Sequence, residues 1–391
     1  MLENLAPQAP DALLALIKLH AADPRPDTID LGVGVYRTGQ GDTPVFGAIK
    51  AAERKLVEEQ DSKSYLGPEG DMGFVNALMP YVFGEDATMG GRIQGMQTPG
   101  GTGAVRLAAA LARHAGVTKV HIGSPSWPNH AQILADLPLA MAPFEHACPD
   151  GTANLDAVLA AIGDARTGEA VLLHGCCHNP TGIDYTPAQW DAIAAAFAQS
   201  PALPIIDLAY QGLGHGMEPD AYGLRKVLAS VPEALVAYSC DKNFGLYRDR
   251  VGAFYVMAAE SGQLEAIMSN ANALARANWS MPPDHGAAAV RLVLRDPALT
   301  LEWEDELDTM RERMRQVRAR LAEAGQVGSL DLTPLGTQNG LFSMLRLSRD
   351  QIGALRENHG IYMAGSGRIN VAGLTTGNID KFVAAIRAVA A

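Results

Sequence analysis

The segment from Ala234 to Lys242 reads ALVAYSCDK, a short apolar run that ends in polar residues. The same pattern recurs at residues 92–98, 119–123, 170–173 and 203–206. Longer alanine- and leucine-rich amphipathic stretches separate these runs, as is typical of an α/β fold in which helices cover a mostly parallel sheet. Ligands of such folds bind beyond the carboxyl ends of the strands. The polar residues that follow the runs are therefore the candidates for a site.

The C-terminal part of the chain has a different pattern. Apolar residues at alternating spacings of three and four predict a long helix with one apolar face. They are Trp303, Leu307, Met310, Met314, Val317 and Leu321. Short strand-like runs and a final helix from about Ile379 follow. We expect a large domain over residues 44–309 and a smaller α+β domain over residues 12–43 and 310–391, connected by the long helix.

Composition and charge exclude several classes of function. The chain has 31 Lys and Arg against 43 Asp and Glu, a formal net charge of −12. Such a chain repels nucleic acids and anionic lipids, so we expect neither as a partner. No apolar run reaches the roughly 18 residues that span a bilayer, and no signal peptide begins the sequence. The four cysteines lack the spacing of a metal or redox site. We therefore expect a cytoplasmic protein without a bound metal.

A few polar residues after the runs can carry chemistry. Gly100–Gly103 precedes a helix, where free N–H groups can bind a phosphate, although a plain turn is equally compatible. Lys242 follows a buried run, where burial would make its amine nucleophilic. Ser239 and Arg250 could bind the same phosphate, although isolated residues of these types are more often solvated. Asp207 also follows a buried run and needs a cationic partner, such as a protonated heterocyclic nitrogen, unless it only caps a helix.

Six segments resemble, in order and across nearly the whole chain, the motifs of class I aminotransferases of subgroup alpha, which act on aspartate and aromatic amino acids. They are LGVGVY (31–36), SWPNH (126–130), HNPTG (178–182), DLAYQG (207–212), SCDKNFGLYRDRVG (239–252) and SGRIN (366–370). The resemblance implies the pyridoxal-phosphate-dependent transferase fold of type I, with pyridoxal 5'-phosphate as cofactor. It also implies a homodimer with shared active sites, in which an N-terminal arm (residues 1–11) grips the partner subunit.

The resemblance implies a role for each residue around the cofactor. Lys242 would hold it as a Schiff base and then move the substrate's proton, while Asp207, supported by His130, would pair with the ring nitrogen. The remaining ring contacts would come from Trp127, Asn179 and Tyr210. The phosphate contacts would come from Gly101, Thr102, Ser239 and Arg250, and from Tyr65 of the partner subunit.

The resemblance also implies how the substrate is bound. Arg368 would pair with the α-carboxylate, since a planar guanidinium suits a carboxylate bidentately. The other contacts to the α-carboxylate would come from Gly34, Trp127 and Asn179. Arg276 would cross the dimer interface to bind a distal carboxylate, so that aspartate, glutamate and their 2-oxo acids are substrates.

Three positions depart from the strict aspartate enzymes. Asp241 replaces a common serine next to Lys242, and we expect its side chain to point away from the lysine. Met281 and Ser64 stand where asparagine is common, which makes the rim of the pocket more apolar or roomier. At these positions, and in the sequence as a whole, the chain resembles the bacterial aromatic aminotransferases. We therefore expect aromatic amino acids as additional substrates.

The predicted reaction is ping-pong transamination between an amino acid and a 2-oxo acid such as 2-oxoglutarate. Alternatives are a strict aspartate aminotransferase, or a lyase or decarboxylase with the same cofactor and fold. A nucleotide-binding oxidoreductase would need a GxGxxG motif after the first strand, which is not found. A non-catalytic binding module would be expected to have lost Lys242, Asp207 or Arg368.

Overall fold

The computed structural model describes residues 1–7 and 12–390. Residues 8–11, part of the expected N-terminal arm, lie outside the described residues. The chain forms two compact units, one over residues 1–43 and 313–391 and a larger one over residues 44–312. No described helix is both long enough and apolar enough to cross a membrane.

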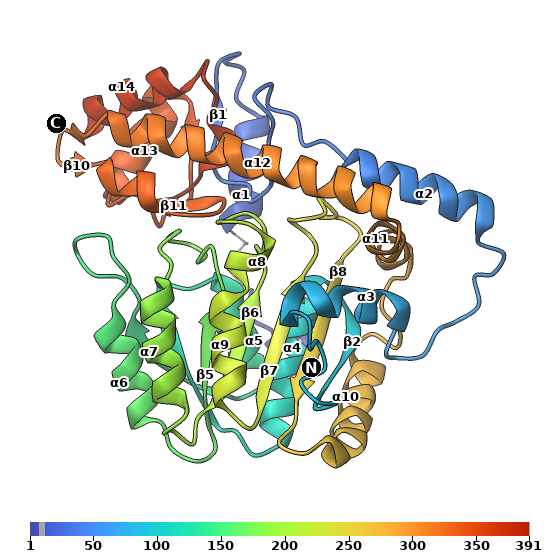
Figure 1. Ribbon diagram of the computed structural model, residues 1–391. Helices are drawn as coiled ribbons and strands as arrows, with labels where there is room; N and C mark the ends of the chain where they lie inside the picture. Colours follow the sequence, from blue (N-terminus) through green and yellow to red (C-terminus); the bar gives the residue numbers. More distant parts are fainter. Residues whose placement is uncertain (8–11, 391) are drawn as a thin grey trace. The chain divides into compact units, whose positions relative to one another are not determined.

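Among the described residues of the larger unit, seven strands form one sheet in the order β2-β8-β7-β6-β5-β3-β4 (Figure 1). The strands are β2 (Ile93–Pro99), β3 (Lys119–Ser124), β4 (Ala140–Glu145), β5 (Glu169–His174), β6 (Leu203–Leu208), β7 (Ala234–Ser239) and β8 (Val251–Met257). Strand β8 is antiparallel to both neighbours, and the other neighbouring pairs are parallel. The expected mostly parallel sheet is confirmed, and the five apolar runs are five of its strands.

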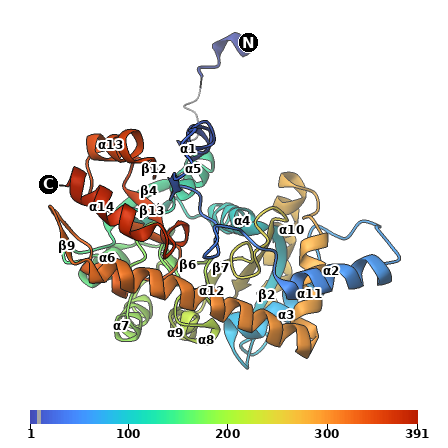
Figure 2. The ribbon, with the colours of Figure 1, turned by 90° about the horizontal axis from the view of Figure 1, so that it is seen from above.

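Helices cover both faces of this sheet. They are α2 (Gly47–Glu59), α3 (Met72–Phe83), α4 (Gly100–His114), α5 (Pro128–Asp136), α6 (Leu155–Asp164), α7 (Pro187–Phe197), α8 (Met217–Asp220), α9 (Tyr222–Ser230), α10 (Leu264–Asn278) and α11 (His285–Arg295), with the 3-10 turn η2 (Ser261–Gln263). Figure 2 shows α4 and α10 on one face of the sheet and α7 and α9 on the other.

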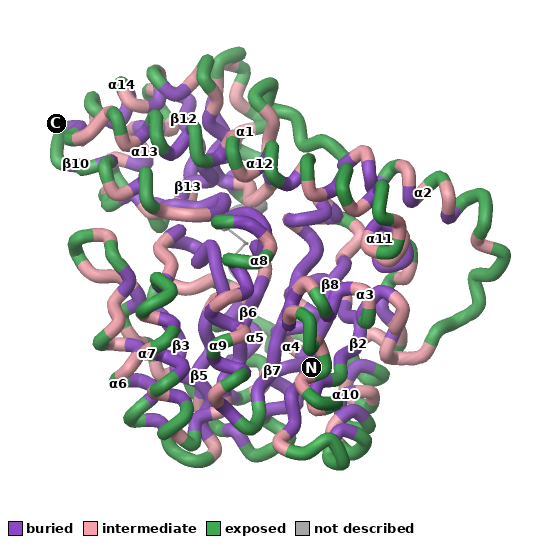
Figure 3. The backbone as a smooth tube through the Cα atoms, in the orientation of Figure 1, coloured by how far each residue is buried: buried purple, intermediate pink, exposed green. Residues whose placement is uncertain are grey.

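One hydrophobic core of the larger unit lies between the sheet and α4. Helix α4 buries Ala104, Leu107 and Ala108 completely, and these side chains pack with those of the strands. Small alanine side chains let the helix axis approach the sheet closely, because little volume separates the two backbones. Figure 3 shows the central strands as buried segments. This packing fixes where the N-terminus of α4 meets the carboxyl ends of the strands.

The long helix predicted near the C-terminus is α12 (Pro297–Glu323), which begins in the larger unit and ends in the smaller one. All six residues of the predicted apolar face are buried. The predicted final helix is α14 (Ile379–Val389). Both helix predictions are therefore confirmed, because the apolar spacing matched the helical repeat.

The smaller unit combines short strands with helices. Strand β1 pairs with β12 in parallel, and the pairs β11–β13 and β9–β10 are antiparallel. Its elements are η1 (Leu2–Asn4), α1 (Ala12–Ala21), β1 (Ile29–Asp30), β9 (Gln326–Val327), β10 (Leu330–Asp331), η3 (Thr333–Thr337), β11 (Phe342–Met344), α13 (Arg349–His359), β12 (Ile361–Tyr362), β13 (Arg368–Asn370), η4 (Val371–Gly373) and α14. Their buried side chains form one apolar core with the end of α12.

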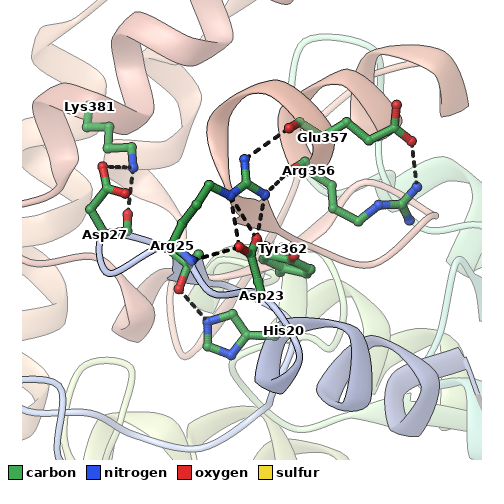
Figure 4. A network of polar contacts seen from close by, with 9 residues as sticks. His20, Asp23, Arg25, Asp27, Arg356, Glu357, Tyr362 and Lys381 are labelled. Atoms are coloured by element: carbon green, nitrogen blue, oxygen red, sulfur yellow. Dashed lines mark hydrogen bonds and ion pairs between the residues drawn. The ribbon is translucent and has the colours of Figure 1, made fainter.

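A polar network joins the N-terminal segment to the C-terminal elements of the smaller unit (Figure 4). Arg25 forms an ion pair with Asp23 and donates to the carbonyl oxygens of Arg356 and Glu357 at 2.9 Å each. Tyr362 Oη donates to Asp23 Oδ2 at 2.6 Å. These bonds, that from Arg25 above all, hold the pKa of Asp23 far below its usual range. The network anchors the chain just before β1, which leads directly into the LGVGVY motif.

Candidate active site

A cavity of about 230 Å³ lies in the larger unit, at the carboxyl ends of β5, β6 and β7 and the start of α4. We call it the strand-end cavity. It is lined by Gly101, Thr102, Trp127, His174, Asn179, Asp207, Ala209, Tyr210, Ser239, Asp241, Lys242 and Arg250. Nine of these residues were predicted as site residues from the sequence, so the structure brings them together.

The glycine-rich segment forms the first turn of α4. The expectation that a loop over 100–103 precedes the helix was wrong, because α4 begins at Gly100. Gly100 has a φ of +71°, which favours glycine, and a Cβ on Gly101 would lie 2.8 Å from Ser239 Cβ. The first N–H groups of a helix lack partners within it. With Thr102, Ser239 and Arg250 beside them, they suit a phosphate.

Lys242 follows β7 and lines the cavity with Tyr210. Its Nζ lies 5.5 Å from the centre of the Tyr210 ring. Burial lowers the pKa of Lys242, and the nearby Arg250 lowers it further, whereas Asp241 and Asp207 raise it. A lysine with a lowered pKa is more often neutral, as a nucleophile or base must be.

Asp207 occupies β6 and is buried. His130 Nε2 lies 3.0 Å from Asp207 Oδ2, so His130 supports the carboxylate from outside the cavity lining. Ser126 Oγ lies 3.0 Å from both His130 Nδ1 and His174 Nε2 and links the two rings. A buried carboxylate that faces a cavity suits a cationic ligand atom.

Further histidines extend this network away from the cavity. The ring of His178 lies 4.3 Å from that of His174 and stacks on that of His146 at 3.5 Å, measured between centroids. His146 Nε2 lies 2.8 Å from the carbonyl oxygen of Ile183. Burial lowers the pKa of His174 and His178, and that of His146 to about 4. These three rings are therefore neutral near pH 7.

Asn179 and Tyr210 lie next to each other on the cavity wall. Asn179 Nδ2 donates to Tyr210 Oη at 3.4 Å. Asn179 Oδ1 is buried and has no hydrogen-bond partner among the described residues. Buried polar atoms are nearly always paired, so this oxygen indicates that a ligand completes the site.

The expected orientation of Asp241 was wrong. Its side chain is buried and lines the same cavity as Lys242, with Oδ2 2.5 Å from Arg250 Nη1. Strand β7 ends at Ser239, so the strict alternation of side chains does not continue into the turn that follows. The backbone N–H of Asp241 donates to Ser239 Oγ at 3.2 Å, which stabilises this turn.

Sequence analysis did not identify His174 as a site residue. His174 ends β5 and lies in register with Asp207 on β6. Because the carboxyl ends of parallel strands meet at one edge, its position as the first polar residue after the apolar run 170–173 was the available signal. His178 begins the HNPTG motif and His146 directly follows β4, but neither lines the strand-end cavity.

Besides His130, two predicted residues of the larger unit lie outside the lining of the strand-end cavity. Tyr65 is 94% exposed in the single chain. Arg276 is exposed near the end of α10 and donates to Ser280 Oγ. Neither is needed for the packing of its own unit, so both are available to another molecule.

The remaining two predicted residues belong to the smaller unit. Arg368, on β13, donates to the carbonyl oxygen of Gly32 at 3.1 Å, and its guanidinium lies 4.4 Å from the centre of the Phe342 ring. A Cβ on Gly34 would lie 2.7 Å from Phe342 Cζ. The Phe342 ring therefore packs against both Arg368 and Gly34 and brings these two residues close together.

Comparison with known proteins agrees with this site. Residues 26–386 match the family described as aminotransferase class I and II. A tyrosine aminotransferase of Rhizobium meliloti is 50% identical over 377 residues, which cover 96% of this chain and 97% of that protein. An aspartate aminotransferase of Escherichia coli is 41% identical, with all of both chains covered.

Solved structures give the same result. An aromatic amino acid aminotransferase with 3-indolebutyric acid has a TM-score of 0.95, 39% identity and full coverage of both chains. An aromatic-amino-acid aminotransferase from Burkholderia pseudomallei, covalently bound to pyridoxal phosphate, has a TM-score of 0.96, 34% identity and full coverage of both chains. With the family match, this likeness shows that the chain belongs to the class I and II aminotransferases.

Proposed function

We propose that this aminotransferase uses pyridoxal 5'-phosphate to exchange amino groups between aspartate, glutamate or aromatic amino acids and 2-oxo acids. The observation that carries the proposal is that Lys242, Asp207 and the start of α4 share one cavity. When bound, the cofactor links to the substrate's amino group and draws electrons away from its Cα. The covalently bound cofactor in the Burkholderia relative supports this assignment.

The cavity residues divide the binding of the cofactor between them. The N–H groups of Gly101 and Thr102, the Ser239 hydroxyl and the Arg250 guanidinium would hold the phosphate. Asp207, backed by His130, would hold the protonated ring nitrogen. The last group of contacts, to the ring face and its oxygen, would come from Trp127, Asn179 and Tyr210. The unpartnered Oδ1 of Asn179 supports a polar ligand here.

Lys242 would both hold the cofactor covalently and move the proton at the substrate's Cα. The pKa of Lys242, lowered first of all by burial, supports a neutral amine that can accept this proton. The cavity walls would exclude bulk water from that proton. Transamination then needs the lysine to return the proton to a different atom, so its side chain must reach both positions.

Arg368, on the smaller unit, would bind the substrate's α-carboxylate, aided by Gly34 with Trp127 and Asn179. Arg276 of the partner subunit would bind a distal carboxylate, and Tyr65 of the partner subunit would reach the phosphate. The exposure of both in the single chain supports a homodimer with shared sites, for which we propose a cytoplasmic location. Residues 44–309 would then hold the cofactor and part of the substrate, and residues 12–43 with 310–391 would supply Gly34 and Arg368 to the substrate.

Substrate range is the finer part of the proposal. Relatives named for tyrosine and for aspartate are both highly similar, which supports a pocket that accepts both kinds of side chain. Met281 and Ser64 support the same reading, because neither offers the amide that a strict dicarboxylate pocket would use. A strict aspartate aminotransferase is the alternative.

An absorbance titration tests the proposal. The purified chain, loaded with pyridoxal phosphate, is recorded alone and after aspartate or phenylalanine, with no oxo acid present. We expect both amino acids to convert the bound cofactor to its amine form. A response to aspartate alone would support the strict alternative. A chain that cannot be loaded would refute the cofactor assignment.

A further inference from the structure

A carboxylate lies among the groups that suit a phosphate. Asp241 Oδ2 is 2.5 Å from Arg250 Nη1, and a Cβ on Gly100 would lie 3.2 Å from the same oxygen. Asp241 is thus at the N-terminal turn of α4, where a phosphate would bind. Its side chain is only 4% exposed, so water screens its charge weakly.

The second oxygen of this carboxylate has no internal partner. Asp241 Oδ1 is buried and accepts no hydrogen bond from the described residues. Arg250 therefore compensates the Asp241 charge through one oxygen, while the same guanidinium would bind the phosphate. An anion is attracted by the N-terminus of α4, by Ser239 and by Arg250. The negative charge of Asp241 repels the same anion.

We propose that Asp241 acts as a counter-charge that competes with the cofactor's phosphate for Arg250 and thereby weakens the retention of phosphorylated ligands. The inference rests on the proposed function, because it assumes that the strand-end cavity holds a phosphate. A phosphate monoester carries about −1.5 to −2 charges at pH 7. Like unit charges about 6 Å apart, at an effective dielectric of about 20, change a binding constant tenfold or more.

The test measures binding rather than turnover. The full-length chain, stripped of cofactor, is titrated calorimetrically with pyridoxamine phosphate, which needs no covalent bond, and with inorganic phosphate. We expect D241N to bind pyridoxamine phosphate at least tenfold more tightly than the unmodified chain, and inorganic phosphate more tightly as well. D241S serves as a second variant if D241N does not fold.

Three controls separate the charge from other effects. D241E keeps the charge and should bind as weakly as the unmodified chain. D136N removes the same charge at an exposed position on α5 and should leave both affinities unchanged. Pyridoxamine without phosphate should bind D241N and the unmodified chain equally, since it has no group for Asp241 to oppose.

The outcomes distinguish failure of the Asp241 inference from failure of the proposed function. Equal or weaker binding of pyridoxamine phosphate by D241N and D241S would overturn the inference, because Asp241 would then only position Arg250. In that case the proposed function stands, provided that the unmodified chain binds the ligand. If none of the chains binds pyridoxal or pyridoxamine phosphate, the proposed function itself fails.

Discussion

At the scale of single residues, the environment of each side chain decides what it can do. Lys242 and Asp207 both have buried surroundings, but only Asp207 has a hydrogen-bonded supporter, His130, behind it. Burial of Lys242 favours its neutral form. The Asp207 carboxylate, held in place by His130, is available to bind a cation. The two proposed roles, proton transfer for Lys242 and charge stabilisation for Asp207, fit these different environments.

Replacing Lys242 by Ala tests the first role. Loss of the amine should lower kcat for aspartate and 2-oxoglutarate by at least about 10²–10⁴-fold, the usual contribution of a positioned acid–base group. Steady-state kinetics give the value, and an absorbance spectrum should show cofactor bound without a covalent link. Lys226→Ala, which removes an exposed lysine paired with Asp191, is the matched control and should keep normal turnover. Near-normal kcat in Lys242→Ala would contradict the mechanism.

Replacing His146 by Gln tests the neutral histidines. Because burial lowers the pKa of His146 from 6.5 to about 4, the unfolded chain binds more protons than the folded chain between these pH values. The free energy of unfolding therefore falls as pH drops from about 6.5 to about 4, by about 1.4 kcal/mol per pH unit for this group. Urea titrations at several pH values give the free energy of unfolding at each pH. The slope of this free energy against pH should be smaller in the variant.

The control for this experiment is His114→Gln, at an exposed position. It should leave the slope unchanged, since His114 is not buried. An unchanged slope in His146→Gln as well would show that His146 does not resist protonation in the folded chain.

At the scale of elements, the sequence predicted strand ends and helix periodicity well. The apolar runs matched five strands because burial on both faces demands continuous apolar residues. The start of α4 was misplaced because glycine disfavours helix interiors, yet a first turn tolerates it where a ligand or a close neighbour requires it. The orientation of Asp241 and the contacts among His146, His174 and His178 were not predicted, because turn geometry and ring stacking beyond a strand leave no periodic trace in the sequence.

Helix α12 supports the turn that carries Lys242 through the side chain of Trp303. The indole is fully buried, stacks on Phe244 at 4.5 Å between centroids, and donates from Nε1 to the carbonyl oxygen of Asn243 at 2.7 Å. Trp303→Phe should keep much of the stacking but leave that buried carbonyl unpaired, lowering the free energy of unfolding by about 1–3 kcal/mol.

Urea unfolding measures this loss, with Leu301→Ala, an exposed change on the same helix, as control. Because Asn243 directly follows Lys242, the variant should also bind pyridoxal phosphate more weakly. Unchanged stability in Trp303→Phe would mean that another group satisfies the Asn243 carbonyl.

At the scale of the whole molecule, the roles proposed for Tyr65 and Arg276 depend on a second subunit. Both are exposed in the single chain, and both lie outside the lining of the strand-end cavity. Their roles came from the resemblance alone, since no pattern within one chain can indicate a residue that serves a neighbour. Both side chains are exposed in the single chain, as the proposed shared site requires.

Mixing two inactive variants tests the shared site. In a dimer of Lys242→Ala with Arg276→Ala, a shared arrangement places both defects in one site and leaves the other site intact. Unfolding the variants together and refolding them at equal amounts should therefore restore about a quarter of the normal activity with aspartate and 2-oxoglutarate, because half of the dimers are mixed and each has one intact site. Lys242→Ala mixed with Asp207→Ala is the control and should restore none, since those residues line the same cavity of one chain. If the first mixture also stays inactive while mixed dimers form, Arg276 serves its own chain.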